Sequence, residues 1–127
     1  MNDKNTRKLA YNHGILAEIL VAWLYRLRGY RLISKRQRTP FGEIDLIMRR
    51  SNFLVFIEVK ARKKNTNHAS AFSERQQKRV FQAAEYYFHK NFYGQNLKTR
   101  IDYACVGPSL LRIKILFGAD RSIEFRK

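Results

Sequence analysis

The stretch GEIDLIMRR-SN-FLVFIEVKAR, residues 42–62, decides the fold. Two apolar segments flank Ser51-Asn52, a connection short enough for a tight turn. The pattern predicts two antiparallel strands, over 42–50 and 53–62, joined as a hairpin. The second segment is apolar on both faces as far as Ile57, which predicts a central strand in a sheet that is covered on both sides.

Further elements are expected on either side of this hairpin. Apolar residues at helical spacing predict a helix over about 8–28, and Gly29 follows it where a left-handed cap belongs. Residues 1–7 are polar and are expected to fray. The remaining elements are a strand over 30–38, a turn at 39–42, a polar loop over 63–70, a helix over about 73–91, strands over 100–106 and 110–117, and a short edge piece at 123–125. The predicted fold class is α/β, with a mixed sheet flanked by two main helices in a single domain, 1–127.

Charge is the strongest compositional feature. The chain has 26 Lys and Arg residues against 10 Asp and Glu, for a formal net charge of +16. Such a field attracts polyanions, so a nucleic-acid partner is expected, with an anionic membrane surface as the competing partner. No uncharged run approaches the roughly 18 residues that span a bilayer. One cysteine, Cys105, and no Cys/His zinc spacing favour a reducing, intracellular setting.

Three of the ten acidic residues fall within the hairpin strands: Glu43, Asp45 and Glu58. Side chains two positions apart on a strand share a face, which pairs Glu43 with Asp45 and Glu58 with Lys60. A tight hairpin would place Asp45 across from positions near 55–58. Burying clustered carboxylates costs on the order of several kcal/mol unless positive charge offsets them. Lys60 can offset one of these negative charges. Carboxylate oxygens are ligands that Mg²⁺ and Mn²⁺ prefer, so the pattern predicts a divalent-metal site.

Ordinary roles for the same residues stay open at this stage. Glu58 could pair with Lys60 or an arginine on a solvated sheet face, and Glu43 and Asp45 could cap turns. Glu18 is the only charge in the apolar part of the first helix. It either pairs with an arginine at the surface or presents a carboxylate to the metal site.

GEIDLI followed by FIEVKAR resembles the PD-(D/E)XK nuclease motif, and most closely the bacterial YraN-like family of uncharacterised proteins. HGILAE, GYRLISKRQR, the helix with AAEYYF and RIDYACV match as well, so the resemblance covers nearly the whole chain. It implies a restriction-endonuclease-like core related to Holliday junction resolvases, with an antiparallel meander plus a parallel strand. It also implies a cytoplasmic bacterial protein and a homodimer.

The resemblance implies a role for each residue at a motif position. Asp45 and Glu58 would be catalytic metal ligands, and the backbone carbonyl of Val59 would complete the site for Mg²⁺ or Mn²⁺. Lys60 would orient the attacking water or stabilise charge on the phosphate. Glu18 would match the catalytic glutamate that resolvase-like members carry on a helix.

Two auxiliary residues and some departures from the family pattern complete this prediction. Glu43 would be an auxiliary carboxylate. Ile44 stands where the motif has Pro, and Ala17 stands where YraN-like chains often carry Gly. Gln76 occupies a place where relatives often have Lys, which puts a catalytic role of the second helix in doubt. Its neighbour Gln77 is the expected substitute, with Lys78 beside it.

Basic residues around this region are expected to contact phosphates, and this binding would weaken steeply with salt. They are Arg36, Arg38, Arg62, Lys63, Lys64, Lys78 and Arg79. None of these residues specifies a base sequence. Recognition of a nucleic-acid structure, such as branched DNA, is therefore expected rather than sequence-specific recognition, and DNA is preferred to RNA.

Three functions compete at this point. The first is a metal-dependent nuclease that hydrolyses phosphodiester bonds in DNA. The second is a non-catalytic nucleic-acid-binding protein that keeps the nuclease fold, although pure binding needs no clustered carboxylates. The third is a membrane-surface or protein-partner adaptor, whose first helix would have to expose Trp23 and Tyr25.

Overall fold

The hairpin at the centre of the fold forms where the sequence predicts it. The computed structural model describes residues 3–61, 72–107 and 113–116. Strands β2 (Gly42–Arg50) and β3 (Phe53–Ala61) pair antiparallel, with Arg50 opposite Phe53. Ser51 has a φ of 54°, the left-handed conformation that tight hairpin turns use to match the twist of their strands.

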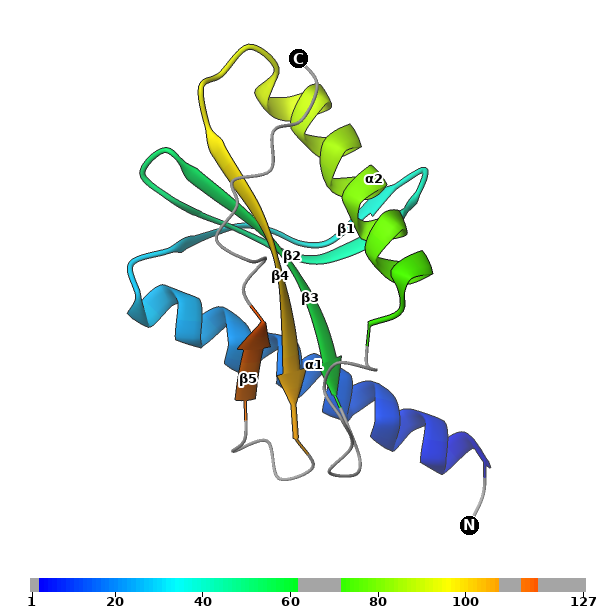
Figure 1. Ribbon diagram of the computed structural model, residues 1–127. Coiled ribbons are helices and arrows are strands. Elements are labelled where there is room, and N and C mark those ends of the chain that lie inside the picture. The colour runs from blue at the N-terminus through cyan, green and yellow to red at the C-terminus, as the bar shows by residue number, and fades with distance from the viewer. Residues whose placement is uncertain (1–2, 62–71, 108–112, 117–127) are drawn as a thin grey trace.

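The sheet is mixed and has five strands in the order β1-β2-β3-β4-β5 (Figure 1). Strand β1 (Arg31–Thr39) completes the antiparallel meander, β4 (Lys98–Val106) runs parallel to β3, and β5 (Ile113–Leu116) is antiparallel to β4. Helix α2 (Glu74–Phe92) forms the crossover between β3 and β4, and Ser73 caps it by accepting from Gln76 N. The predicted α/β fold with a meander, a parallel strand and two main helices is confirmed. The edge piece expected at 123–125 lies outside the described residues.

Helix α1 (Asp3–Leu27) begins five residues before the expected start at Lys8, so the expectation that residues 3–7 fray is wrong. Asp3 lies in the first turn, where a negative charge interacts favourably with the helix dipole. The end of the helix agrees with the prediction. Gly29 has a φ of 91°, and Tyr30 N donates to Tyr25 O at 3.0 Å to close the cap.

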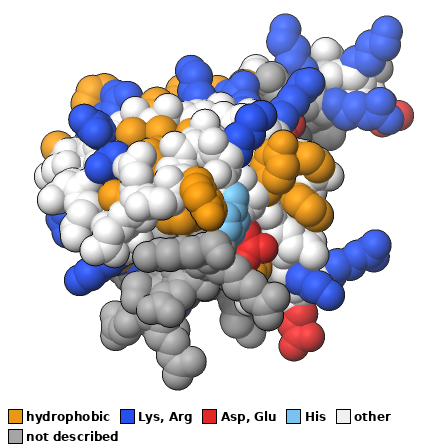
Figure 2. All heavy atoms as spheres, turned by 90° about the horizontal axis from the view of Figure 1, so that it is seen from above, with side chains coloured by type: hydrophobic (Ala, Val, Ile, Leu, Met, Phe, Trp, Pro, Cys, Tyr) orange, Lys and Arg blue, Asp and Glu red, His pale blue; other side chains and the backbone are white. Residues whose placement is uncertain are grey.

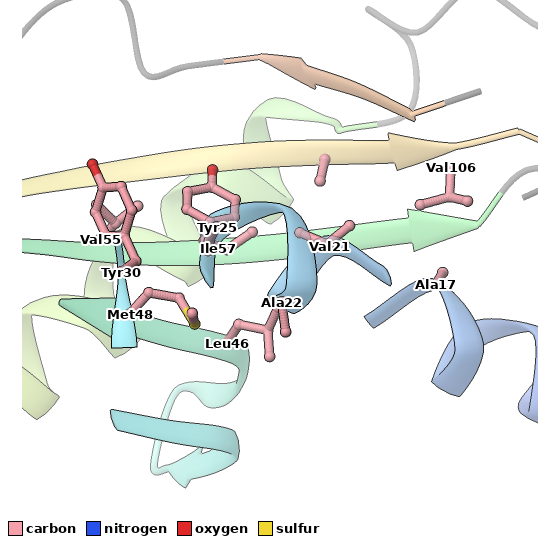
Figure 3. Close-up of a cluster of buried hydrophobic side chains, with 11 residues drawn as sticks. Ala17, Val21, Ala22, Tyr25, Tyr30, Leu46, Met48, Val55, Ile57 and Val106 are labelled. Atoms are coloured by element: carbon pink, nitrogen blue, oxygen red, sulfur yellow. The ribbon is translucent and has the colours of Figure 1, made fainter. Parts of the chain in front are cut away.

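Each face of the sheet is covered by one helix. Helix α1 packs Ala17, Val21, Ala22 and Tyr25 against Leu46, Met48, Val55 and Ile57 in the cluster that Figure 3 shows. Helix α2 packs Val80, Ala83, Ala84 and Phe88 against Ile44, Ile47, Leu54 and Phe56. Phe81 and Tyr87, which the helical pattern also suggests as buried, are only partly buried. Strand β3 is therefore central and covered on both sides, as predicted.

A buried carboxylate ties α1 to β4. Asp102 is fully buried and accepts from the Tyr25 hydroxyl at 2.5 Å and from Arg100 Nε and Nη2 at 2.6 and 2.8 Å. Burial, followed by the Asp102 charge, raises the pKa of Tyr25 far above its ordinary value. The hydroxyl therefore stays protonated and remains a donor. We call these three residues, Tyr25, Arg100 and Asp102, the Asp102 cluster.

The outer face of α1 carries large apolar side chains in solvent: Leu9, Leu16, Ile19, Trp23 and Leu27. The buried face of the helix uses smaller residues instead, with Tyr25 as its one large member. The adaptor hypothesis requires both Trp23 and Tyr25 to be exposed. Trp23 is 55% exposed, but Tyr25 is only 1% exposed, so the structure meets this requirement for Trp23 alone. Within the described part of the chain, no helix is long and apolar enough to cross a membrane.

Candidate functional site

Asp45 and Glu58 meet where β2 separates from β3. The regular pairing of the two strands ends at Leu46 opposite Ile57. Just beyond this last pair, Asp45 precedes Leu46 on β2 and Val59 lies two residues after Ile57 on β3. There, Asp45 Oδ2 accepts a hydrogen bond from Val59 N at 2.7 Å. The side chain of Asp45 thus satisfies a backbone donor beyond the end of the pairing, and this contact fixes its carboxyl group beside Glu58.

The backbone is irregular at this point on both β1 and β2. Ile44 packs into the cluster on the α2 side, yet Leu46, two residues on, packs into the cluster on the α1 side. Regular alternation would put both on one face. Across from Asp45 in the β1–β2 register, Arg36 has a φ of 48°, in the left-handed region that costs a non-glycine residue about 1–3 kcal/mol. Such strain persists where the surrounding structure enforces it, often at functional sites.

Glu58 is buried without full hydrogen bonding. It is 7% exposed, and its Oε2 has no hydrogen-bond partner among the described residues. Arg79 of α2 lies near its other oxygen, with Nη2 at 3.8 Å from Oε1. An unsatisfied buried acceptor costs about 1–3 kcal/mol, more when it is charged, so Glu58 is poorly stabilised as an anion in the protein alone.

The two carboxyl groups interact, and the charge of Asp45 raises the proton affinity of Glu58. Burial raises the pKa of Glu58 most, and the Asp45 charge and a hydrogen bond between the two groups raise it further. Burial also raises the pKa of Asp45, although the hydrogen bond from Val59 N opposes the change. Tyr103 is opposite Glu58 in the β3–β4 register, and burial together with the Glu58 charge raises its pKa to about 12. The region therefore favours either a shared proton or an added cation.

Two further carboxylates interact with this pair through their charge. Glu18 of α1 accepts from Arg36 Nε at 3.1 Å, and its pKa is raised by burial first and then by the charges of Asp45 and Glu43. It therefore pairs with an arginine, as one of the two predicted roles has it, and its charge interacts with that of Asp45, while the role toward a metal ion stays a prediction. Glu43 is exposed, and its charge raises the pKa of Asp45. We call Glu18, Glu43, Asp45 and Glu58 the acidic cluster.

The other predicted site residues divide between those near the pair and one that lies apart. Lys60 is half-buried two positions beyond Glu58 on β3, where strand alternation gives the two a common face. Val59 contributes the N–H that Asp45 accepts. Gln77, by contrast, donates a hydrogen bond from Nε2 to the backbone oxygen of Phe72 at 3.0 Å. This contact stabilises the start of helix α2. The structure directs this side chain to backbone capping rather than to the carboxyl pair.

Arg79 contacts two members of the acidic cluster, which the sequence did not predict. It was expected only as a phosphate contact, yet it faces Glu58 and also donates from Nη1 to Glu43 O at 3.4 Å. Its guanidinium passes over Gly42, where a Cβ atom would lie 2.2 Å from Nη1. Gly42 has a φ of 127°, which also excludes most other residues. The glycine before Glu43 was the available signal, because a missing side chain next to an acidic motif leaves room for a neighbour.

The donor set agrees with a hard divalent cation. Asp45 and Glu58 supply carboxylate oxygens, of which Glu58 Oε2 has no hydrogen-bond partner within the described part of the chain, and the carbonyl of Val59 is the neighbouring backbone donor. The described residues include no group of three or more His, Cys, Asp and Glu side chains arranged to hold a metal. Mg²⁺ commonly takes one or two carboxylates and fills the remaining positions with water and phosphate oxygens, so a two-carboxylate site fits that ion.

Basic side chains are abundant near the acidic cluster. Of the predicted phosphate contacts, Arg36, Arg38 and Lys78 are exposed, and Arg79 is half-buried. Arg62, Lys63 and Lys64 lie outside the described residues. Figure 2 shows Lys and Arg side chains spread over the face it displays, with few acidic ones among them. A polyanion that reaches the acidic cluster would therefore meet positive charge around it.

A five-stranded mixed sheet between two helices, with a buried carboxyl pair where the two central hairpin strands separate, defines an α/β protein with an acidic site. The chain belongs to the uncharacterised protein family UPF0102, the YraN-like family, whose model matches residues 17–106. This range contains every residue of the acidic cluster. The predicted family is thereby confirmed.

The relatives are bacterial proteins of similar length. A UPF0102 protein from Rhodopseudomonas palustris (strain BisB18) is 40% identical over 105 residues, covering 83% of this chain and 78% of the relative. The UPF0102 protein bll0669 from Bradyrhizobium diazoefficiens is 37% identical over 116 residues, covering 91% and 87%. A UPF0102 protein from Parvibaculum lavamentivorans is 40% identical over 99 residues, covering 78% and 74%.

Proposed function

We propose that this protein is a metal-dependent nuclease that hydrolyses phosphodiester bonds in DNA, with a preference for branched or otherwise irregular structures. The observation that carries the proposal is the buried Asp45–Glu58 pair in a strongly basic chain, with a Glu58 oxygen that no described residue hydrogen-bonds. A protein that only binds nucleic acid has no need of carboxylates that repel its ligand. A site that activates water beside a phosphate needs them.

Asp45, Glu58 and the carbonyl of Val59 are the groups that would hold Mg²⁺ or Mn²⁺. When bound, the ion would lower the pKa of a water molecule and neutralise charge on the phosphate. Asp45 would keep its orientation through the hydrogen bond from Val59 N. Lys60, on the face of Glu58, would stabilise the negative charge that develops on the phosphate.

The remaining members of the site would act around this centre. Glu18 and Glu43 would keep the local potential negative enough to retain a cation, with Glu18 held by Arg36. Arg79, which offsets Glu58 in the protein alone, would turn to a phosphate once a metal ion takes over that role. Arg38 and Lys78 are exposed and would contact flanking phosphates without reading bases.

Cleavage assays with matched variants test the proposal. Purified protein is incubated with labelled four-way junction, flap, single-stranded and duplex DNA, and with RNA, in Mg²⁺, Mn²⁺ or EDTA. Asp45→Asn and Lys60→Ala proteins are run beside Glu74→Gln, which removes an exposed carboxylate on α2. We expect cleavage that requires metal, disappears in the first two variants and persists in the third. Binding without cleavage under all conditions would favour the non-catalytic alternative.

The cellular setting belongs to the same proposal. We place the activity in the cytoplasm of a bacterial cell, where a buried cysteine thiol such as that of Cys105 stays reduced. The resemblance to resolvases implies a homodimer, which light scattering with and without DNA would detect. A monomer on every substrate would remove the homodimer from the proposal and leave the active site unaffected.

A further inference from the structure

A shallow groove lies between α1 and β1, beside the acidic cluster. Ile19 and Trp23 of α1 form its apolar wall, and Arg26, Lys35 and Arg36 line its edge. Its volume is about 190 Å³. Pockets for complete drug-sized ligands measure roughly 300–1,000 Å³, so this groove suits one flat ring rather than a larger molecule.

Trp23 gives the groove an aromatic surface that solvent can reach. The residue is 55% exposed, and the guanidinium of Arg26 lies 5.2 Å from the centroid of its ring. An exposed aromatic ring next to basic residues is the usual arrangement in proteins that bind single-stranded nucleic acid, where the ring stacks on a base and the cations follow the backbone. Lys35 is exposed on β1 and supplies a further positive charge.

The groove shares a residue with the acidic cluster. Glu18 lines it and is also a member of the acidic cluster, where the charge of Asp45 raises its pKa. Arg36 joins the two regions as well, because it lines the groove, pairs with Glu18 and lies across from Asp45 on β1. A nucleic-acid strand with one phosphate at the carboxyl pair therefore has the groove within reach of a nearby nucleotide.

We propose that this groove binds an unpaired nucleobase of the substrate by stacking on Trp23, with neighbouring phosphates held by Arg26 and Lys35. The inference rests on the proposed function and specifies its substrate class: nucleic acid with unpaired nucleotides beside the cleaved bond. Bases inside a duplex are stacked on each other and cannot enter the groove. A second copy of the chain is disfavoured as the occupant, because each copy carries a formal net charge of +16.

Fluorescence of Trp23 tests the proposal directly, because the chain contains one tryptophan. The protein is titrated in EDTA, which prevents cleavage, with a single-stranded oligonucleotide and separately with the blunt duplex of the same sequence. We expect the single strand to quench the emission at lower concentration than the duplex does. Equal quenching by both would overturn the proposal.

The binding affinities of two variants give a second test of the proposal. Trp23→Leu keeps an apolar side chain at an exposed position, so its fold is checked by its thermal melt. It should weaken single-strand binding roughly 5- to 100-fold, the range that base–aromatic stacking supports, and leave duplex binding within about twofold. Leu27→Ala is the matched control, since Leu27 is 80% exposed on the same helix and does not line the groove. Equal single-strand affinity in wild type and Trp23→Leu would contradict the proposal.

Other occupants give distinct outcomes. A shift of the emission with protein concentration alone would assign the surface to a second copy. A shift with vesicles of phosphatidylcholine and phosphatidylserine, but not with the oligonucleotide, would assign it to a membrane. Either result overturns nucleobase binding. Failure of the nuclease function would leave the EDTA titration unchanged, whereas failure of the groove would leave cleavage of a substrate with unpaired nucleotides equal in wild type and Trp23→Leu.

Discussion

Two buried carboxylates lie on adjacent strands of the same sheet and differ in how they are stabilised. Asp102 of β4 is opposite Ile57 of β3 in the parallel register, and Glu58 is the next residue on β3. Asp102 accepts hydrogen bonds from both Tyr25 and Arg100. Glu58 has one arginine at 3.8 Å and an oxygen without a hydrogen-bond partner among the described residues.

Under the proposed function, this difference is the one expected between a structural carboxylate and one that binds a cation. Buried charges are normally paired and hydrogen-bonded, as Asp102 is. Glu58 and Asp45 retain an energetic penalty that a protein could remove with an amide at either position. A site that binds a cation needs this incomplete stabilisation, because a fully satisfied carboxylate has little to gain from a metal ion. The following predictions test the contrast.

The largest effect is expected from Asp102→Asn. The substitution removes the negative charge from a fully buried position, so the guanidinium of Arg100 loses the opposite charge of Asp102. Breaking a buried ion pair in this way costs about 3–5 kcal/mol. Urea unfolding should show that loss in the free energy of unfolding, while Tyr25→Phe, which deletes one hydrogen bond, should cost about 1–3 kcal/mol. A loss below 1 kcal/mol for both variants would contradict a structural role of the Asp102 cluster.

Glu58→Gln should have the reverse profile, with a large effect on catalysis. Under the proposed function Glu58 is a charged metal ligand, and its removal is expected to lower the cleavage rate by about 10²–10³-fold, comparable to the loss of one group that stabilises the transition state. The measurement is single-turnover cleavage of a labelled junction in Mn²⁺. Glu74→Gln, which removes an exposed carboxylate, should keep the wild-type rate within about twofold. A rate for Glu58→Gln close to that of wild type would count against the proposed site.

The same Glu58→Gln variant should be more stable than wild type in EDTA at pH 8. The pKa of Glu58 is raised in the folded protein, so the folded state binds more protons than the unfolded state once the pH exceeds the ordinary value of 4.5. Stability therefore falls as the pH rises through this window, and a neutral glutamine removes that loss. We expect a gain of about 1–2 kcal/mol, typical of replaced active-site residues.

Thermal melts at pH 5 and pH 8 check this prediction. The difference between Glu58→Gln and wild type should be small at pH 5, where much of the wild-type pair is protonated, and larger at pH 8. Added Mn²⁺ should stabilise wild type and leave the variant unchanged. A variant that is less stable than wild type at pH 8 in EDTA would show that Glu58 is as well satisfied as Asp102.

The smallest effect is expected from Arg79→Gln. Arg79 faces Glu58 at 3.8 Å, but its side chain is 37% exposed, and exposed pairs contribute about 0–1 kcal/mol. Urea unfolding in EDTA should show a loss of that size, while Lys78→Gln on the neighbouring exposed position should show none. A loss above about 2 kcal/mol would mean that Arg79 already neutralises Glu58, which would weaken the case for a metal ion.

The elements of the fold follow from local patterns, and for that reason the sequence predicts them well. The apolar segments around Ser51-Asn52 fix the hairpin, and Gly29 ends the first helix at the predicted residue. The start of α1 was misplaced because polar residues 3–7 have no apolar periodicity, although nothing in them opposes a helix. Exposure of Trp23 and Leu27 was not predicted, because helical spacing does not say which face of a helix is covered.

The candidate site was predictable only in part, because half of it depends on contacts between distant segments. Asp45 and Glu58 follow from hairpin pairing, and the structure brings them together. The approach of Arg79 to Glu58, the contact of Asp102 with Tyr25 and the left-handed backbone of Arg36 arise from packing between elements. No local spacing in the sequence encodes them. The contact of Gln77 with Phe72 was not predicted either, because it depends on the turn before α2.

Binding of Mn²⁺ is the most direct test of the central claim that Asp45 and Glu58 form a cation site. Electron paramagnetic resonance measures free Mn²⁺ during titration of wild type, Glu58→Gln and the exposed control Glu74→Gln at pH 8. The account predicts a bound ion in wild type and in the control, with affinity at least about tenfold lower in Glu58→Gln, as for other lost groups at metal sites. Equal Mn²⁺ binding by all three proteins, or none by wild type, would contradict it.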